Sequence, residues 1–338
     1  MRRRTVIKSS ALLALGAVST VGLGSCTKQP SNQADSGPTS DIPLRVAMVP
    51  WVGWSRAKIA EVQGFFEAEG IKVEQKVYDT VTAANAALVA KEVDLAWVVA
   101  ADLVVLADEA PGLKFIMACD YSGDVDAIVG RGISGADDAR NKTFAREDVP
   151  YQIVFLNKYL QSLGLTEKDV KIVSLDVPAA AKALTAGEVD AIAAYEPFVG
   201  NILKEKAETK TLFSAKDSNV IINGLVGHSQ VLQSRRQDVL AYMRALNQGL
   251  DFFKGNPEEG TKIIADWVAS TPTEVTAIME KLNILDLAAN KSIAFASGNK
   301  LNVANSFDSA VPVLVSAGKA TSEVPGISFV DSSFVDAL

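Results

Sequence analysis

The sequence predicts an α/β fold in which two similar lobes face one another across a cleft. The first observation is a repeat: the pattern Ala-Leu-x-Ala-x-Glu-Val-Asp occupies residues 87–94 and again 183–190, each time before a short apolar run. Each copy is typical of a helix end, a turn and a strand buried on both faces. The second observation is the order strand, helix, strand over residues 44–77, which predicts a parallel sheet. Because ligands bind at the carboxyl ends of strands in such sheets, two lobes predict a ligand cleft between facing strand ends.

The second copy of the repeat carries the strongest candidate for a ligand contact. Gly187 fits the C-terminus of a helix, because glycine adopts a positive φ without steric cost. The apolar run 191–194 then forms the strand, and Glu196 stands at the carboxyl end of that strand. Pro197 suits the first position of the next helix, where its missing N–H is not needed. We therefore expect Glu196 to reach the cleft.

The other elements follow from apolar periodicity and from glycines that end helices. The strands that we expect besides 191–194 are 44–49, 71–77, 96–101, 113–119, 127–129, 142–145, 170–175 and 220–226. The expected helices are 58–69, 80–90, 103–107, 151–163, 178–186, 231–254, 261–268, 273–283 and 298–317. The polar residues 120–126 between two apolar strands predict a first crossover between the lobes, and residues 220–226 predict the return. The predicted domains are lobe 1 at 44–126 and 223–338 and lobe 2 at 127–222.

The N-terminus has the pattern of an export signal. Residues 1–26 combine a basic start, an apolar stretch too short to span a bilayer and the sequence Leu-Gly-Ser-Cys ending at Cys26. This resembles a bacterial lipoprotein signal peptide. The resemblance implies lipidation of Cys26 and anchoring on the outer face of the cytoplasmic membrane, in the periplasm or at the surface of a cell with one membrane. The early arginines leave the twin-arginine and the general export routes both open. Residues 27–43 are polar and lack apolar periodicity, so we expect a disordered tether.

Composition and charge narrow the function classes. Removing residues 1–25 takes away four positive charges and no negative ones, which moves the formal charge from −7 to −11. Such an acidic body is a poor binder of nucleic acid. If Cys26 is lipidated, Cys119 is the only other cysteine, so no intramolecular disulfide can form. His228 is the only histidine and no cofactor-binding motif is present, so we expect neither a metal nor a cofactor.

Most of residues 44–320 resemble the nitrate/sulfonate/taurine family of periplasmic solute-binding proteins, the receptors of ABC importers. The resemblance rests on Gly-Phe-Phe-x-x-x-Gly at 64–70, both repeats, Asp120-x-Ser122, and Tyr-Glu-Pro-Phe at 195–198, where relatives commonly have Trp-Glu-Pro or Trp-Asp-Pro. It implies a type II periplasmic-binding-protein fold with mixed, mainly parallel sheets flanked by helices and two crossover strands. It also implies delivery of a small-molecule solute to an ABC permease, with no enzymatic chemistry. We expect a monomer.

The start of the second lobe's first helix departs from the family pattern. Anion binders of the family usually have small hydroxyl residues there, where free N–H groups and the helix dipole favour an anion. Here residues 146–151 read Arg-Glu-Asp-Val-Pro-Tyr, with two carboxylates and a proline that donates no N–H. We therefore expect a small nitrogen-containing solute that is cationic or donates hydrogen bonds, of guanidinium, amidine or amine type, held by carboxylates and aromatic faces. The candidate ligand residues are Trp51, Trp54, Asp102, Asp120, Asp126, Glu147, Tyr195, Glu196 and Phe198.

Other interpretations stay open at this point. Carboxylates at helix starts are often only caps, and aromatic residues beside a first strand are as often core residues as ligand platforms. The solute could instead be an anionic sulfonate, taurine or nitrate, or a pyrimidine precursor of thiamine. A relative of this fold makes that pyrimidine as an enzyme, with a histidine and a cysteine-rich motif, and this chain has neither cluster. A lipoprotein that reports its ligand to a membrane sensor is a further class.

Overall fold

A computed structural model describes residues 41–338 without 219 and 322. The predicted signal peptide, the lipidation site Cys26 and nearly all of the predicted tether lie outside the described residues. Within residues 41–338, those two gaps apart, no helix combines the length and the apolar character that a membrane crossing needs.

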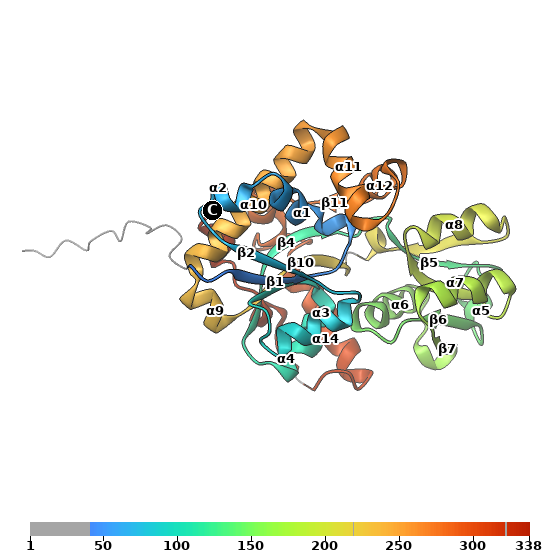
Figure 1. The fold of residues 1–338 in the computed structure, drawn as a ribbon. Helices are drawn as coiled ribbons and strands as arrows, with labels where there is room; N and C mark the ends of the chain where they lie inside the picture. The colour runs from blue at the N-terminus through green and yellow to red at the C-terminus, as the bar shows by residue number, and fades with distance from the viewer. Residues whose placement is uncertain (1–40, 219, 322) are drawn as a thin grey trace, which may run out of the picture. The chain divides into compact units, whose positions relative to one another are not determined.

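The first sheet has six strands in the order β11-β4-β10-β3-β1-β2 (Figure 1). These are β1 (Leu44–Met48), β2 (Val73–Val77), β3 (Leu95–Val99), β4 (Leu113–Tyr121), β10 (Ile222–His228) and β11 (Asn283–Ile284). β1 pairs in parallel with β2 and β3, as the order strand, helix, strand predicts. β10 and β11 pair antiparallel with their neighbours, so the sheet is mixed.

The second sheet has five strands in the order β7-β6-β8-β5-β9. These are β5 (Asp126–Gly130), β6 (Thr143–Arg146), β7 (Lys171–Ser174), β8 (Ala191–Tyr195) and β9 (Lys210–Ser214). β6 pairs in parallel with β7 and β8, and β5 pairs antiparallel with β8 and β9. Each sheet therefore combines a parallel set of three strands with antiparallel strands, and we refer to each sheet with its helices as a lobe.

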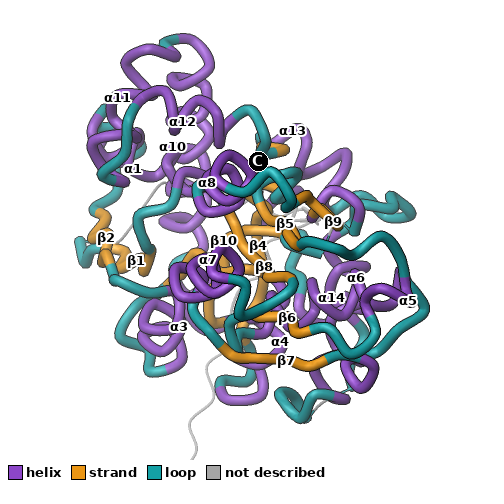
Figure 2. The backbone as a smooth tube through the Cα atoms, turned by 90° about the vertical axis from the view of Figure 1, so that its right-hand side faces the viewer, coloured by secondary structure: helices purple, strands orange, loops and turns teal. Residues whose placement is uncertain are grey.

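Helices flank both sheets (Figure 2). The helices of the first lobe are α1 (Ser55–Val62), α2 (Phe65–Ala68), α3 (Val81–Val89), α4 (Ala100–Glu109), α9 (Ser229–Ser234), α10 (Arg236–Gly255), α11 (Pro257–Val268), α12 (Pro272–Met279), α13 (Leu287–Ala289), α14 (Val303–Ser316) and α15 (Ser333–Asp336). Those of the second lobe are α5 (Ala136–Ala139), α6 (Pro150–Ser162), α7 (Val177–Ala186) and α8 (Phe198–Glu205). Short 3-10 helices are η1 (Val52–Trp54), η2 (Glu167–Asp169), η3 (Ala215–Asp217) and η5 (Gly326–Phe329), and η4 (Asn290–Ala294) is a π-helix.

The chain passes between the two sheets twice. The first passage joins β4 to β5 through residues 122–125, and the second joins β9 to β10 through residues 215–221. The first crossing lies within the polar residues 120–126 that predict it, whereas the second begins before the predicted run 220–226 and overlaps only its first two residues. The predicted domain limits at 126/127 and 222/223 differ from these strand ends by a few residues and stay a prediction.

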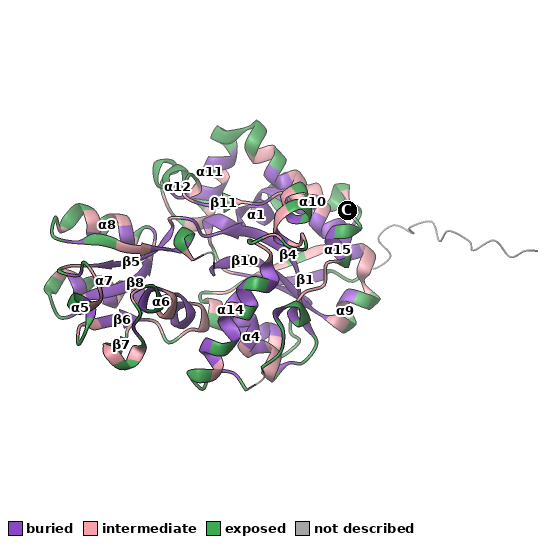
Figure 3. Ribbon diagram, turned by 180° about the vertical axis from the view of Figure 1, so that it is seen from behind, coloured by how far each residue is buried: buried purple, intermediate pink, exposed green. Residues whose placement is uncertain are grey.

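The apolar core continues from one lobe into the other. The largest cluster of buried side chains includes Val104 of α4, Phe155 of α6 and Phe307 of α14, so helices of both lobes meet there. Figure 3 shows the central strands buried and the outer faces of helices such as α11 exposed. Burial of these apolar side chains stabilises the contact between the lobes on one side of the cleft, because apolar surface removed from water contributes about 25 cal/mol per Å² to the free energy of folding.

Some elements differ from their predicted form. The predicted helix 58–69 breaks at Gly64, which has φ 71° and separates α1 from α2. A residue in the left-handed region cannot continue a right-handed helix. The predicted helix 231–254 is likewise divided, at Arg235 between α9 and α10. β9 and β11 were not anticipated, since β9 carries one buried residue and β11 has two residues, so neither has an apolar run to mark it.

Candidate functional site

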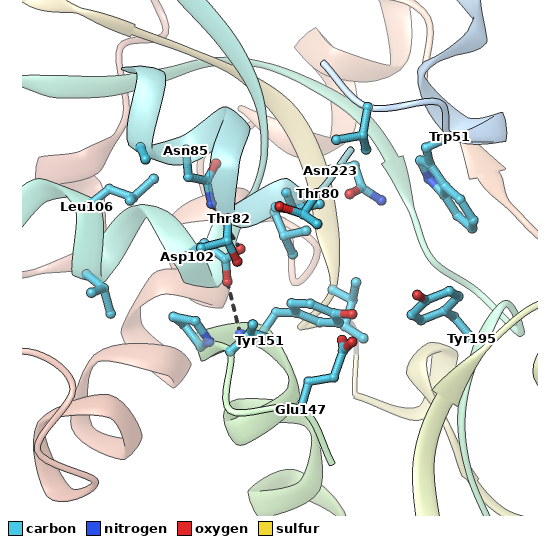
Figure 4. Close-up of a pocket in the computed structure, with 18 of the residues that line it drawn as sticks. Trp51, Thr80, Thr82, Asn85, Asp102, Leu106, Glu147, Tyr151, Tyr195 and Asn223 are labelled. Carbon is cyan, nitrogen blue, oxygen red and sulfur yellow. Dashed lines mark hydrogen bonds between the residues drawn. The ribbon is translucent and has the colours of Figure 1, made fainter. Parts of the chain in front are cut away.

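A cavity of about 630 Å³ lies where the two lobes face one another (Figure 4). Its walls come from the loop after β1, the start and the face of α3, the end of β3 with α4, the start of β5, the loop between β6 and α6, the end of β8, and the start of β10. The parallel strands β1, β3, β6 and β8 all end at this cavity, which is the strand end that the fold rule indicates. The predicted cleft therefore exists, and its volume suits a small organic ligand.

Asp126 occupies a buried position at the start of β5. The residue is 8% exposed, and the Ser122 hydroxyl donates a hydrogen bond to Asp126 Oδ2. Burial, together with the nearby Asp120 and Glu147 carboxylates, raises the pKa of Asp126 to about 7 against the opposing effect of the Ser122 hydrogen bond. Without a partner cation this carboxyl group therefore holds its proton close to neutral pH.

Glu147 lies at the end of β6, next to the ring of Tyr151 (Figure 4). Gln152 Nε2 donates to Glu147 Oε2 at 3.0 Å, and the Glu147 N–H donates to Gln152 Oε1 at 2.8 Å. The same Nε2 donates to the Tyr151 hydroxyl at 3.2 Å, so one amide positions both the acid and the aromatic ring. Burial raises the pKa of Glu147 as well.

Asp102 on α4 of the first lobe forms a hydrogen bond with the second lobe. Its Oδ1 accepts the backbone N–H of Tyr151 at 3.1 Å, drawn as a dashed line in Figure 4, and Asn85 Nδ2 approaches Oδ2 at 3.5 Å. Burial, with a smaller contribution from the negative charge of Glu147, raises the pKa of Asp102 to about 7. The first two positions of α6 thus offer no free N–H group, because Pro150 has none and Tyr151 gives its own to Asp102.

Aromatic rings from both lobes meet beside these acids. Trp51, after β1, makes an edge contact with Tyr195, at the end of β8, with ring centroids 6.3 Å apart. In Figure 4 the ring of Tyr151 lies next to Glu147 and points toward Tyr195. Burial raises the pKa of Tyr195 to about 12, so this phenol stays neutral. Three aromatic faces beside two carboxylates are the composition that cation recognition uses.

The charge of the cavity wall has one sign. Six carboxylates line it, and no lysine, arginine or histidine does so within residues 41–338 apart from the two gaps. The six are Asp79, Asp102, Glu109, Asp126, Glu147 and Asp148. Asp148 is neutralised from outside the wall, because Lys319 Nζ lies 2.7 Å from its Oδ2 and Arg146 Nη1 lies 3.3 Å from its Oδ1.

Of the predicted ligand residues, Trp51, Asp102, Asp126, Glu147 and Tyr195 come together in this wall. Trp54 borders the cavity but is a core residue: it is 1% exposed and its ring stacks on Trp97 at 6.1 Å. Phe198 lies outside the wall and packs edge-on against Tyr195.

Glu196, which we expected at the cleft, has other partners in this structure. Glu196 Oε2 accepts the Gly200 N–H of α8 at 3.0 Å, and Oε1 forms an ion pair with Lys281 of the first lobe. Glu196 is absent from the cavity wall. The alternative function of such a carboxylate, completing a helix start, applies here because the first N–H groups of α8 need an acceptor.

Asp120 is also displaced from the expected position. It is fully buried behind the wall, where its Oδ1 accepts Asn223 Nδ2 at 2.8 Å. Burial raises the pKa of Asp120 to about 6 against the opposing effect of Arg56. Asn223 itself lines the cavity, so Asp120 orients a wall residue and is not part of the wall.

Several wall residues were missed in the sequence. Asn85 stands in the otherwise apolar buried face of α3, and Asn223 stands in the buried strand β10. A buried amide in an apolar run needs a partner, which is a signal that could have found both. Glu109 and Asp79 give no such signal, because exposed acids at helix ends are common.

The comparisons with known proteins agree with this architecture. The family model described as NMT1/THI5 like matches residues 57–260. A protein of Brucella abortus named "Putative binding protein" is 21% identical over 233 residues, 68% of this chain and 72% of its own length. The periplasmic aliphatic sulphonate-binding protein SsuA of Escherichia coli has a TM-score of 0.71 at 13% identity, covering 86% of this chain and 98% of SsuA. The desulfurization enzyme DszB has a TM-score of 0.60 at 15% identity, covering 87% of this chain and 98% of that enzyme.

These matches confirm the predicted resemblance and the two-lobed fold. The family model spans more than half of the chain, and the structural likeness extends over both lobes. The chain therefore belongs to the NMT1/THI5-like family and has the fold of the periplasmic solute-binding proteins.

Proposed function

We propose that this protein is the substrate-binding component of an ABC importer, and that its solute is a small nitrogen-containing cation of guanidinium, amidine or amine type. One observation carries the choice of ligand, namely a cavity wall with six carboxylates and no basic side chain among the described residues. Of these acids, a deeply bound ligand would contact Asp102, Asp126 and Glu147. A cation would keep them ionised, where without it burial favours their neutral forms.

The start of α6 supports the same choice. A helix N-terminus attracts an anion when its first N–H groups are free. Here Pro150 offers none, the Tyr151 N–H is bound by Asp102, and the Glu147 N–H before the helix is bound by Gln152. A sulfonate, the ligand named for SsuA, would have to displace a carboxylate of the protein itself. That exchange costs the hydrogen bonds already made, so the anionic alternatives are disfavoured.

The enzymatic alternative has less support. DszB shows that this fold can carry chemistry. In this chain Cys119 is buried, and its thiol donates a hydrogen bond to the Gly53 carbonyl. His228 Nε2 lies 2.8 Å from the Leu88 carbonyl oxygen. Neither residue lines the cavity, whose described wall contains no cysteine or histidine nucleophile or base. Capture and release of a solute therefore fits the wall better than a reaction does.

The location and partners follow from the same proposal. Lipidation of Cys26 would hold the protein on the outer face of the cytoplasmic membrane, in the periplasm, as a monomer that presents both lobes to the permease. Release of the protein from the membrane fraction by Cys26→Ala is the measurement that checks the anchor. A receptor that reports to a membrane sensor would share this site and this anchor.

The first experiment is a thermal-shift series on the full chain. Guanidinium, benzamidine and small amines form one set, and taurine, alkylsulfonates, nitrate and pyrimidines form the other. A ligand at a hundred times its Kd adds about 2.7 kcal/mol to the free energy of unfolding, so a specific ligand is readily seen. We expect stabilisation by cations alone.

Two variants test the site. Asp126→Asn and Glu147→Gln should each weaken cation binding by about 2 kcal/mol, roughly thirtyfold in Kd, because each removes a charged partner. Asp124→Asn is the matched control, since Asp124 lies two residues from Asp126 but is paired with Lys216 outside the cavity. Stabilisation by sulfonates or nitrate with no response to cations would overturn the proposal.

A further inference from the structure

The acids of the cavity wall fall into a buried group and an exposed group. Asp102 and Asp126 are buried, Glu147 is half-buried, and all three line the cavity. Asp102 accepts the Tyr151 N–H, and Gln152 donates to both the Tyr151 hydroxyl and Glu147, so Asp102 and Glu147 lie on either side of Tyr151. Asp79 and Glu109 are exposed. We call the first three the deep acids and Asp79 with Glu109 the outer acids. The wall therefore offers negative charge at two depths.

Helix α4 fixes the separation between the two groups. Asp102 stands in its first turn and Glu109 is its last residue, seven positions later and so on the same face after two turns. A rise of 1.5 Å per residue places them about 10 Å apart along the helix axis. Val105 and Leu106 lie between them and also line the cavity. Along α4 the wall therefore has an acidic residue at each end and apolar surface between them.

The outer acids are available to a ligand. Within the described residues, neither Asp79 nor Glu109 takes part in an ion pair or a side-chain hydrogen bond, whereas Asp148, the other exposed acid of the wall, is paired with Lys319 and Arg146. Glu109 also stands at the C-terminus of α4, where the helix dipole adds to its attraction for a cation. Asp79 does not cap α3, because the Thr80 side chain is the group that accepts a hydrogen bond from the start of that helix.

We propose that the solute is a linear diamine, with one ammonium group among the deep acids and the other beside the outer acids. This rests on the proposed function and narrows its ligand class. The aliphatic spacer lies along Val105 and Leu106, and the deep ammonium group faces Trp51, Tyr151 and Tyr195. A guanidinium or a short monoamine would fill only the deep end of a cavity of about 630 Å³. A diamine long enough to span about 10 Å satisfies both charged ends and the apolar surface between them.

The test compares hexamethylenediamine with hexylamine, which has the same carbon chain and one ammonium group. Calorimetric titration of the full chain at low ionic strength should give a Kd at least tenfold lower for the diamine. Putrescine, with a shorter spacer, should lose part of that advantage. Raising the salt concentration should reduce the advantage too, because the outer acids are exposed and screened by salt.

Variants assign the two ends. In the double variant Asp79→Asn with Glu109→Gln, the diamine should bind no better than hexylamine, and hexylamine should bind as it does to the unaltered protein. Asp126→Asn should weaken both ligands. Because Asp79 and Glu109 are exposed and outside the core, far-UV circular dichroism should show an unchanged fold.

The outcomes separate this inference from the proposed function. Equal affinities for the diamine and hexylamine in the unaltered protein would overturn the diamine and leave a cation receptor. A diamine advantage that survives in the double variant would also overturn it, because the second ammonium group would then be held elsewhere. Binding of sulfonates or nitrate with no binding of either amine would overturn both.

Discussion

At the scale of single residues, the deep acids couple ligand binding to protons. Burial raises the pKa values of Asp102 and Asp126 to about 7. An unfolded aspartic acid has a pKa of about 3.9. Between these values the folded protein binds more protons than the unfolded chain does, so the free energy of unfolding falls as pH rises from about 4 to about 7. A bound cation requires the ionised forms and therefore releases these protons.

We predict that affinity for a cationic solute rises with pH up to about 7 and is constant above it. The expected gain approaches tenfold per pH unit for each proton released, and titration in buffers of different ionisation enthalpy counts those protons. In Asp126→Asn one of these protons is absent, so the pH dependence should become shallower. An affinity for cations that is flat between pH 5 and pH 8 would contradict this coupling.

At the scale of elements, the two repeats turn out to be equivalent structural units. Asp94 accepts the Arg45 N–H of β1 at 2.9 Å, and Asp190 accepts the Thr143 N–H of β6 at 2.9 Å. Each carboxylate also pairs with a basic side chain beside that N–H, Arg45 in the first lobe and Lys142 in the second. The repeated aspartates therefore join the strand that follows each repeat to its parallel neighbour, β3 to β1 and β8 to β6, and neither lines the cavity.

The repeats also share a left-handed residue at the turn, and this gives a matched pair of stability predictions. Gly187 has φ 84° and the equivalent Lys91 has φ 60°. Gly187→Ala should lower the free energy of unfolding by about 1 kcal/mol, because a Cβ is strained at positive φ. Lys91→Gly should raise it by a few tenths of a kcal/mol, since relief of that strain slightly exceeds the added chain entropy of glycine. Urea unfolding measures both.

Ligand affinity serves as the control for this pair, and it should not change in either variant because both turns lie outside the cavity wall. If Gly187→Ala were as stable as the unaltered protein, the left-handed turn would not be what ends α7.

At the scale of the whole described molecule, polar contacts tie the two lobes together around the cavity. Glu196, after β8, pairs with Lys281, just before β11, and Asp148, after β6, pairs with Lys319, beyond α14. Trp51 of the first lobe also contacts Tyr195 of the second. A ligand bound by both lobes favours the conformation in which these contacts are made, because it binds that conformation better than an open one.

We predict that Lys281→Gln weakens ligand binding although Lys281 does not line the cavity. Lys281 is more than a third exposed, so its pair contributes about 0.2–1 kcal/mol, which is at most roughly fivefold in Kd. Small-angle scattering should show a larger radius of gyration for the ligand-free variant. Lys254→Gln is the control, since its partner Asp286 belongs to the same lobe. Equal Kd values for both variants would exclude a role of the ion pair in closure.

The sequence by itself determined the two-lobed α/β fold, the positions of most strands and the excess of acids near the cleft. These features depend on local patterns: apolar runs place buried strands, and Gly187 and Gly164 take the left-handed conformations that end their helices. Trp51, Asp102, Asp126, Glu147 and Tyr195 follow from their places at strand ends and helix starts.

Only the tertiary structure decided which acids face the ligand. Glu196 and Asp126 both stand at ends of strands of the second sheet, and each accepts a hydrogen bond from a residue four positions away, Gly200 and Ser122. Lys281 lies 85 positions along the chain from Glu196 and takes that carboxylate away from the cavity, whereas Ser122 holds Asp126 in the wall. The outer acid Glu109 enters the site because α4 carries it there, two turns beyond Asp102. Because a partner such as Lys281 comes from a distant part of the chain, periodicity and spacing locate a strand end but not the direction in which its carboxylate points.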